Sequence, residues 1–168
     1  SIVLAANDFS NGDLGGWTGV SIFDAGGEMG EVLYIDQRQT AALHFEIPAD
    51  ASNAIMGFTL FGGDTLDNED AIISINGIPV VIATGYHGTM SIEIPQVDGT
   101  IAMAQVMVEQ VNMGSGGRYL NAGDSKAVVS INVSDPPDGI TLGIYSNNSH
   151  GKNGDEFWAI DDVLVTAS

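Results

Sequence analysis

Carboxylates and side-chain amides are the residues of this sequence whose type and spacing could do chemistry. They gather in three groups, one near the start of the chain, one in its middle and one leading into its last apolar run. The chain has 22 Asp and Glu against 4 Lys and Arg, so ion pairs cannot neutralise most of the acids. Unpaired carboxylates are costly to bury, and Ca²⁺ binds about six to eight oxygen ligands of these kinds. We therefore expect a domain that binds Ca²⁺.

The first group joins the two ends of the chain. Asp8 and Asn11 follow the first apolar run, and Asp161 and Asp162 lie within the last one. The terminal strands of a sandwich are often neighbours, so a cation bound here would link the ends of the chain. Strand alternation sends Asp161 and Asp162 to opposite faces, so we expect only one of the two to be a ligand.

The second group immediately precedes the apolar run 71–75. Its side chains could wrap one cation, and the residues concerned are Asp64, Asp67, Asn68, Glu69 and Asp70. The spacing differs from that of an EF-hand loop, because the aspartates fall three apart and the central glycine is absent. The alternative is a solvated acidic loop, which is the usual role of a run of charge.

The third group is the loop 147–156 beside Trp158. We expect Asp155 to be a metal ligand and four residues of this loop to contact a bound molecule: Asn147, Asn148, Asn153 and Glu156. An aromatic ring beside amides and carboxylates suits a sugar, and also a peptide carboxylate bridged by a cation; alternatively, Trp158 packs in the core. The glycine-rich segment 112–118 is predicted to be a loop that offers Ser115 and Arg118 to the ligand.

The sequence gives little support to catalysis. His44, His87 and His150 show no zinc-binding spacing, and no nucleophile elbow or phosphate-binding glycine loop is present. A carboxylate pair for glycoside cleavage carries no information when acids are so abundant. We expect a protein that is not an enzyme and has no catalytic residues.

Composition limits the class of protein and its partners. A chain of 168 residues that is 44% hydrophobic can form one domain with a substantial core. Its net charge of -18 disfavours nucleic acids and anionic membrane surfaces. Cysteine is absent, which excludes disulfides and thiolate metal sites, and no apolar run approaches membrane-spanning length.

Short apolar runs separated by Gly, Asn, Asp and Pro predict an all-β, antiparallel β-sandwich of jelly-roll type that spans 1–168 as a single domain. Asn76-Gly77 is the strongest hairpin signal. The predicted strands are 2–6, 20–23, 31–35, 40–47, 54–61, 71–75, 78–83, 90–94, 102–111, 126–133, 141–145 and 157–166.

The order of these motifs resembles a jelly-roll module of the giant repeats-in-toxin (RTX) adhesins of Gram-negative bacteria. The resemblance is carried by Asn7-Asp8-Phe9, Gly16-Trp17, the segment 30–33, the acidic loop before Asn76-Gly77, and the segment 155–163. It implies an extracellular, calcium-loaded module on the bacterial cell surface, monomeric by itself and joined to neighbouring domains of a larger adhesin. A related carbohydrate-binding motif pairs an early Phe-Glu with a late Asp-Asp-Val; here the early motif is Phe9-Ser10, so Asp8 or Asn11 must replace the Glu.

The resemblance implies that protein-bound calcium receives the free C-terminal carboxylate of a target peptide. Two alternatives remain open: a lectin-like module for a cell-surface glycan, and a calcium-stiffened structural spacer. The glycan alternative requires exposed aromatic rings, and the candidates are Trp17, Tyr34, Tyr86, Tyr119, Tyr145 and Trp158.

Overall fold

The computed structural model describes residues 1–63, 70–82, 88–95, 99–114, 124–147 and 157–168. In these ranges the chain forms twelve strands and no helix, so the described part contains no helix able to cross a membrane. The strands are β1 (Ile2–Asn7), β2 (Ser21–Asp24), β3 (Glu31–Ile35), β4 (Thr40–Glu46), β5 (Asn53–Gly63), β6 (Ala71–Ile75), β7 (Ile78–Ile82), β8 (Gly88–Pro95), β9 (Ile101–Gly114), β10 (Asp124–Ser134), β11 (Gly139–Ser146) and β12 (Phe157–Ala167).

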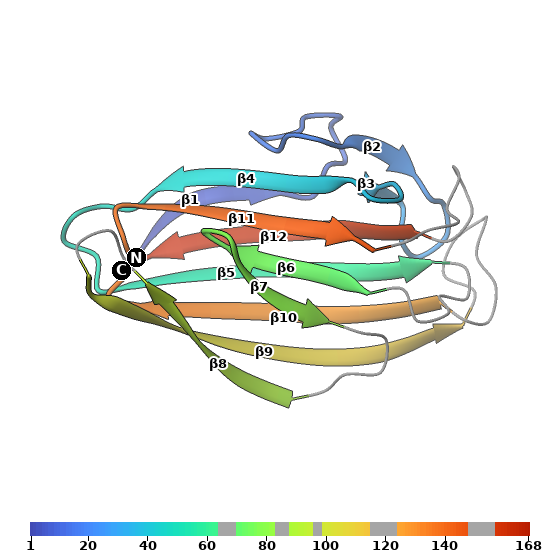
Figure 1. Cartoon of the computed structure of the whole chain (residues 1–168). Helices are drawn as coiled ribbons and strands as arrows, with labels where there is room; N and C mark the ends of the chain where they lie inside the picture. Colours follow the sequence, from blue (N-terminus) through green and yellow to red (C-terminus); the bar gives the residue numbers. More distant parts are fainter. Residues whose placement is uncertain (64–69, 83–87, 96–98, 115–123, 148–156) are drawn as a thin grey trace.

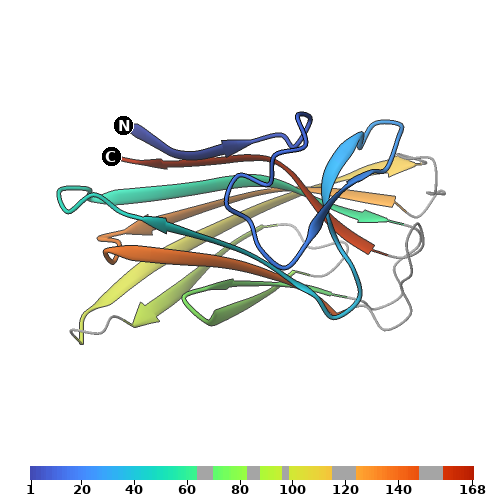
Figure 2. The same cartoon turned by 90° about the horizontal axis from the view of Figure 1, so that it is seen from above.

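The strands form two antiparallel sheets packed as a sandwich (Figures 1 and 2). The large sheet has the order β2-β3-β12-β5-β10-β9-β8, and β1 also pairs with β12. The small sheet has the order β4-β11-β6-β7. The all-β antiparallel sandwich expected from the sequence is confirmed. One expected loop begins later than predicted, because residues 112–114 still belong to β9.

The main core lies between the two sheets and follows the two-residue period of the strands. On β10, Ala127, Val129, Ile131 and Val133 are buried while the residues between them face outward. Trp158 of β12 is 2% exposed and packs in this core. The same alternation therefore determines which side chains of β10 can meet a ligand.

A second, smaller core covers one end of the outer face of the large sheet. Phe61 and Phe157 lie there with Met29, Tyr34 and Phe23 from the β2–β3 hairpin. The ring centroids of Tyr34 and Phe157 are 5.0 Å apart and those of Phe23 and Tyr34 are 5.1 Å apart. The hairpin thus covers this end of the outer face.

Turn chemistry determines where several strands end. Asn76 (φ 50°) and Gly77 (φ 84°) are both left-handed between β6 and β7, which confirms the predicted type I′ hairpin. Asn76 also holds the neighbouring strand: its Oδ1 accepts from the Thr141 N–H at 2.8 Å and its Nδ2 donates to the Gly139 carbonyl at 3.2 Å.

Candidate functional site

The two ends of the chain lie side by side, as predicted. β1 pairs antiparallel with β12, from Ile2 opposite Ala167 to Asn7 opposite Val163, and both termini appear together in Figures 1 and 2. Beyond this pairing, an open hollow is lined by Asp8, Asn11 and Asp162, with Ala6, Asn7 and Val163. The structure therefore brings together three of the predicted metal ligands.

A β-bulge places both aspartates of β12 outside the main core. The pairing of β12 with β5 shifts between Asp161 and Leu164, and Asp162 has a left-handed φ of 51°. Asp161 lies opposite Thr59 and is half-buried, Asp162 is exposed, and Val163 returns to the core. The extra residue interrupts the strict alternation assumed from the sequence, and only Asp162 of the two aspartates lines the hollow.

Two aspartates at this end of the β1–β12 pairing, Asp161 and Asp8, have opposite pKa shifts. Burial raises the pKa of Asp161 to about 6, and the charges of Asp162 and Asp8 add to this, against a hydrogen bond from the Asp162 N–H. The pKa of Asp8 is lowered, because its Oδ1 accepts from the Ser10 hydroxyl at 2.7 Å and from the Ser10 N–H at 3.1 Å. The site thus concentrates negative charge around a half-buried carboxylate.

The donor atoms around this hollow suit a hard cation only in part. Two carboxylates and an amide are oxygen donors of the kind Ca²⁺ binds, but the Asn11 Oδ1 already accepts from the Asp13 N–H at 3.0 Å. Within the described ranges, no three His, Asp or Glu side chains gather closely enough to hold a metal ion. Backbone carbonyls or water would have to complete the coordination.

Most residues of the other two acidic groups, and the two predicted ligand contacts of the glycine-rich segment, lie outside the described residues. This applies to Asp64, Asp67, Asn68, Glu69, Asn148, Asn153, Asp155, Glu156, Ser115 and Arg118. Asp70 and Asn147 are described, and the Asn147 N–H donates to the Asp70 carbonyl at 2.9 Å. The middle and late groups therefore adjoin at this point, although they are 77 residues apart in sequence (147 minus 70).

Three of the six aromatic residues proposed for sugar stacking are buried. Trp17, Tyr34 and Trp158 are 3%, 4% and 2% exposed, and all three belong to cores. Tyr86 and Tyr119 lie outside the described residues. Tyr145 is half-buried on the small sheet. Among the described candidates, only Tyr145 keeps substantial exposure.

The outer face of the large sheet holds a groove that the sequence analysis did not predict. It has an open volume of about 320 Å³ and is lined by outward-facing residues of four adjacent strands: Ile55, Thr89, Gln105, Met107, Ser130 and Asn132. Strand register brings them together, since Asn132 lies between Ile55 and Gln105, while Ser130 lies between Gly57 and Met107. Gly57 has no side chain to fill this surface.

The groove combines hydrogen-bonding groups with exposed apolar ones and has no charged lining residue. Met107 is 55% exposed and Ile55 is 41% exposed, so both present apolar surface to solvent. The Oδ1 atom of Asn132 is buried and has no hydrogen-bond partner. Because this oxygen is closed to solvent, a bound molecule would hydrogen-bond instead with the accessible polar side chains of Gln105, Ser130 and Thr89.

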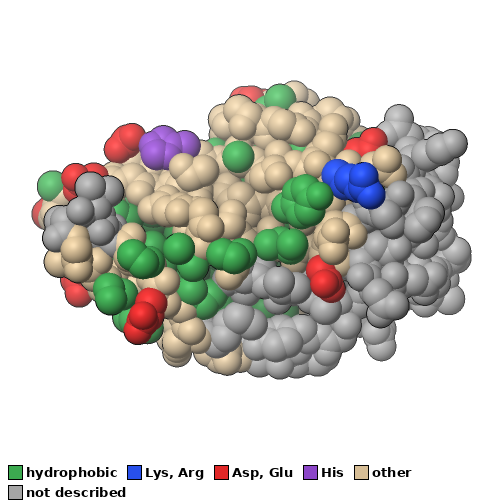
Figure 3. Space-filling model, viewed as in Figure 1, with side chains coloured by type: hydrophobic (Ala, Val, Ile, Leu, Met, Phe, Trp, Pro, Cys, Tyr) green, Lys and Arg blue, Asp and Glu red, His purple; other side chains and the backbone are tan. Residues whose placement is uncertain are grey.

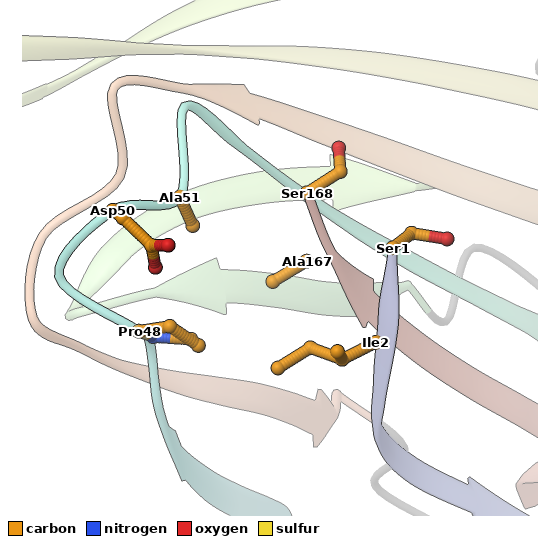
Figure 4. Close-up of a pocket in the computed structure, with 7 residues that line it drawn as sticks. All are labelled: Ser1, Ile2, Pro48, Asp50, Ala51, Ala167 and Ser168. Carbon is orange, nitrogen blue, oxygen red and sulfur yellow. The ribbon is translucent and has the colours of Figure 1, made fainter.

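Two other surfaces present fewer groups that could bind a ligand. A pocket of about 170 Å³ beside the chain ends is lined by Ser1, Ile2, Pro48, Asp50, Ala51, Ala167 and Ser168 (Figure 4). It presents one carboxylate and otherwise small or apolar side chains. On the small sheet, shown face-on in Figure 3, the His44 ring nitrogens lie 2.9 Å from Thr141 Oγ1 and 2.9 Å from Glu46 Oε1. This array is exposed on an open strand surface, where it links β4 to β11.

No protein-family model matches the sequence, and no curated protein matches it. Among solved structures, the chain is similar to the CBM22-1 xylan-binding domain of Paenibacillus barcinonensis Xyn10C, at 12% identity and a TM-score of 0.53, covering 99% of this chain and 94% of that one. This likeness confirms the jelly-roll type of the sandwich.

Two further solved structures align at lower scores. TmCBM61, solved with β-1,4-galactotriose, gives 12% identity, a TM-score of 0.41 and coverage of 96% and 95%. The GH115 4-O-methyl-α-glucuronidase BtGH115A gives 12% identity and a TM-score of 0.47, over 89% of this chain and 16% of that one.

Proposed function

We propose that the chain is a non-catalytic carbohydrate-binding module that holds a glycan in the groove across β5, β10, β9 and β8. The observation that carries this proposal is the groove itself: an uncharged hollow lined by hydrogen-bonding and exposed apolar side chains, on a chain of net charge -18. Ligand sites typically combine apolar walls with a few convergent polar groups.

Each class of lining residue matches a part of a sugar. Sugar hydroxyls can hydrogen-bond with the side chains of Gln105, Ser130 and Thr89. The C–H surface of a pyranose can pack on Met107 and Ile55, which takes the place of aromatic stacking. The xylan-binding domain with a similar fold supports a glycan as the ligand.

The test is calorimetric titration of the purified domain with soluble xylo- and galacto-oligosaccharides. Gln105→Ala should weaken binding about tenfold, because a hydrogen bond to the ligand is lost. Its melting temperature should change little, since this side chain is exposed on the sheet surface. Met107→Ala should also weaken binding, and His44→Ala on the opposite sheet is the control. Unchanged affinity in both groove variants would contradict the proposal.

We also propose that Ca²⁺ binds in the hollow between the chain ends and stiffens the fold. Support comes from the convergence of Asp8, Asn11 and Asp162 and from the cost of the half-buried Asp161 carboxylate, which a cation would offset. Isothermal titration of the metal-free protein with Ca²⁺ tests this proposal. Loss of binding in Asp8→Asn and Asp162→Asn would support it, and an unaltered isotherm in both would contradict it.

A second candidate function is calcium-dependent capture of a peptide C-terminus by an extracellular RTX adhesin on a bacterial cell surface. The hydrogen bond between Asn147 and Asp70 favours it, because it joins the end of the middle acidic loop to the start of the late one. A peptide and glycan array, run with millimolar Ca²⁺ and with chelator, separates the candidates. Capture of neither class, with Ca²⁺ still raising the melting temperature, would favour the structural spacer.

A further inference from the structure

Carboxylates border the groove on both sides along the strands. Glu109 of β9 follows Met107 by two residues, and Glu93 of β8 follows Ser91 by two residues. Both side chains are exposed, and their strand positions alternate with core residues, so they face outward with the groove. Asp161 lies in the same cross-strand row as Glu109, because it is opposite Thr59, and this row also passes through Val128.

Strand register shows that the acids frame two uncharged rows of side chains. One row crosses the sheet through Ile55, Asn132, Gln105 and Ser91. The next row crosses through Gly57, Ser130, Met107 and Thr89. In the described part of the chain, these rows contain no acidic or basic side chain.

The nearest described basic side chain on this face is already engaged. Lys126 lies one row beyond Val128, where its Nζ is 3.7 Å from Glu28 Oε1 and 6.0 Å from the centre of the Phe61 ring. It therefore sits against the β2–β3 hairpin. The long-range field of the whole chain, with its net charge of -18, has the same sign as the framing acids.

From this arrangement we propose that the groove selects uncharged polysaccharide chains and that Glu93 and Glu109 exclude uronate-bearing ones. This inference depends on the proposed glycan-binding function. Two residues of a strand span about 7 Å, so an anionic sugar over Met107 or Ser91 lies within about one Debye length of Glu109 or Glu93 at physiological salt. The nearby carboxylate repels an anionic sugar, whereas a neutral sugar experiences no such repulsion.

Matched ligands test the selection directly. Oligosaccharides of glucuronoxylan and of polygalacturonate are each compared with their own carboxyl-reduced products, in calcium-containing buffer at physiological salt. The reduced form should bind about fivefold more tightly, the order expected for like charges at this separation. In the double variant Glu93→Gln, Glu109→Gln, the preference should shrink by at least half, while Glu46→Gln on the small sheet should retain it.

The outcomes separate the two proposals. Equal or tighter binding of the uronate forms would overturn the charge selection and leave the glycan-binding function standing. An unchanged preference in the double variant would also overturn it, because the framing acids would then not be its cause. Failure of every oligosaccharide to bind, in either form, would overturn the glycan-binding function and the selection together.

Discussion

Replacing Asp161 with Asn should stabilise the protein when calcium is absent. The carboxylate is half-buried between β5 and the bulge of β12, and burial is the main reason that its pKa rises to about 6. Asn has nearly the same shape, and its side-chain oxygen can still accept the hydrogen bond that Asp161 Oδ1 receives from the Asp162 N–H at 2.8 Å. The substitution therefore removes the charge and keeps the contact.

The size of the effect follows from the pKa shift. A rise from 3.8 to about 6 corresponds at neutral pH to about 3 kcal/mol of destabilisation if it is taken in full. The side chain is partly exposed, so solvent screening reduces this to about 1 kcal/mol. For a chain of this length, that difference raises the melting temperature of Asp161→Asn by about 2–4 °C.

The pH dependence has a definite sign. The folded protein holds the Asp161 proton more tightly than the unfolded chain does, so this residue disfavours folding only once the carboxyl ionises. Its unfavourable contribution is absent below about pH 4, grows between about pH 4 and 6, and is constant above that range. The advantage of Asp161→Asn should follow the same course.

Thermal unfolding of the metal-free protein from pH 3.5 to 8 measures this difference. Asp138→Asn, in the exposed turn before β11, is the control substitution. If the bound cation offsets the Asp161 charge, saturating Ca²⁺ should reverse the order of the two proteins at pH 7. A lower melting temperature for Asp161→Asn in chelator at pH 7 would refute the argument.

Three further predictions concern stability. Chelation at pH 7 should remove about 3–4 kcal/mol of stability relative to Ca²⁺ at 100–1,000 times its dissociation constant, and an unchanged melting temperature would contradict the calcium proposal. Phe157→Ala should cost about 3–5 kcal/mol in denaturant unfolding, since this ring is fully buried in the second core, whereas Leu164→Ala, 49% exposed, should cost under about 1 kcal/mol. Gly19→Ala should destabilise by about 2 kcal/mol or more, because φ is +81° and the new Cβ would overlap the Thr40 carbonyl oxygen; Gly12→Ala, at +76° with open space around it, should cost about 1 kcal/mol.

The strands could be predicted because their signals are local. Each apolar run is short and ends at residues such as Asn76-Gly77 that favour a turn, so all twelve strands occur near their predicted places. The pairing of the terminal strands followed from the general preference of sandwiches. The bulge at Asp162 could not be predicted, because an extra residue in a strand leaves no mark on the apolar pattern around it.

The roles of the aromatic residues and the groove depend on tertiary structure. Sequence alone does not show which side of a strand faces the other sheet, so it allows Trp158 to lie either at a binding site or in the core. The structure places it in the core. Each lining residue of the groove, such as Asn132 or Met107, is by itself an ordinary outward-facing strand residue. Only the register of β5, β10, β9 and β8 assembles them into one surface.

The uncharged rows of the large sheet need a cause other than folding. Outward-facing strand positions in a soluble protein are usually occupied by polar or charged residues, and this chain has 22 acids to place. Yet Ile55, Ser130 and Met107 face solvent between carboxylates at both borders. Burial of these side chains in the monomer cannot explain their choice, because Met107 and Ile55 remain 55% and 41% exposed. The proposed contact with an uncharged ligand would account for the missing charge and the exposed apolar surface together.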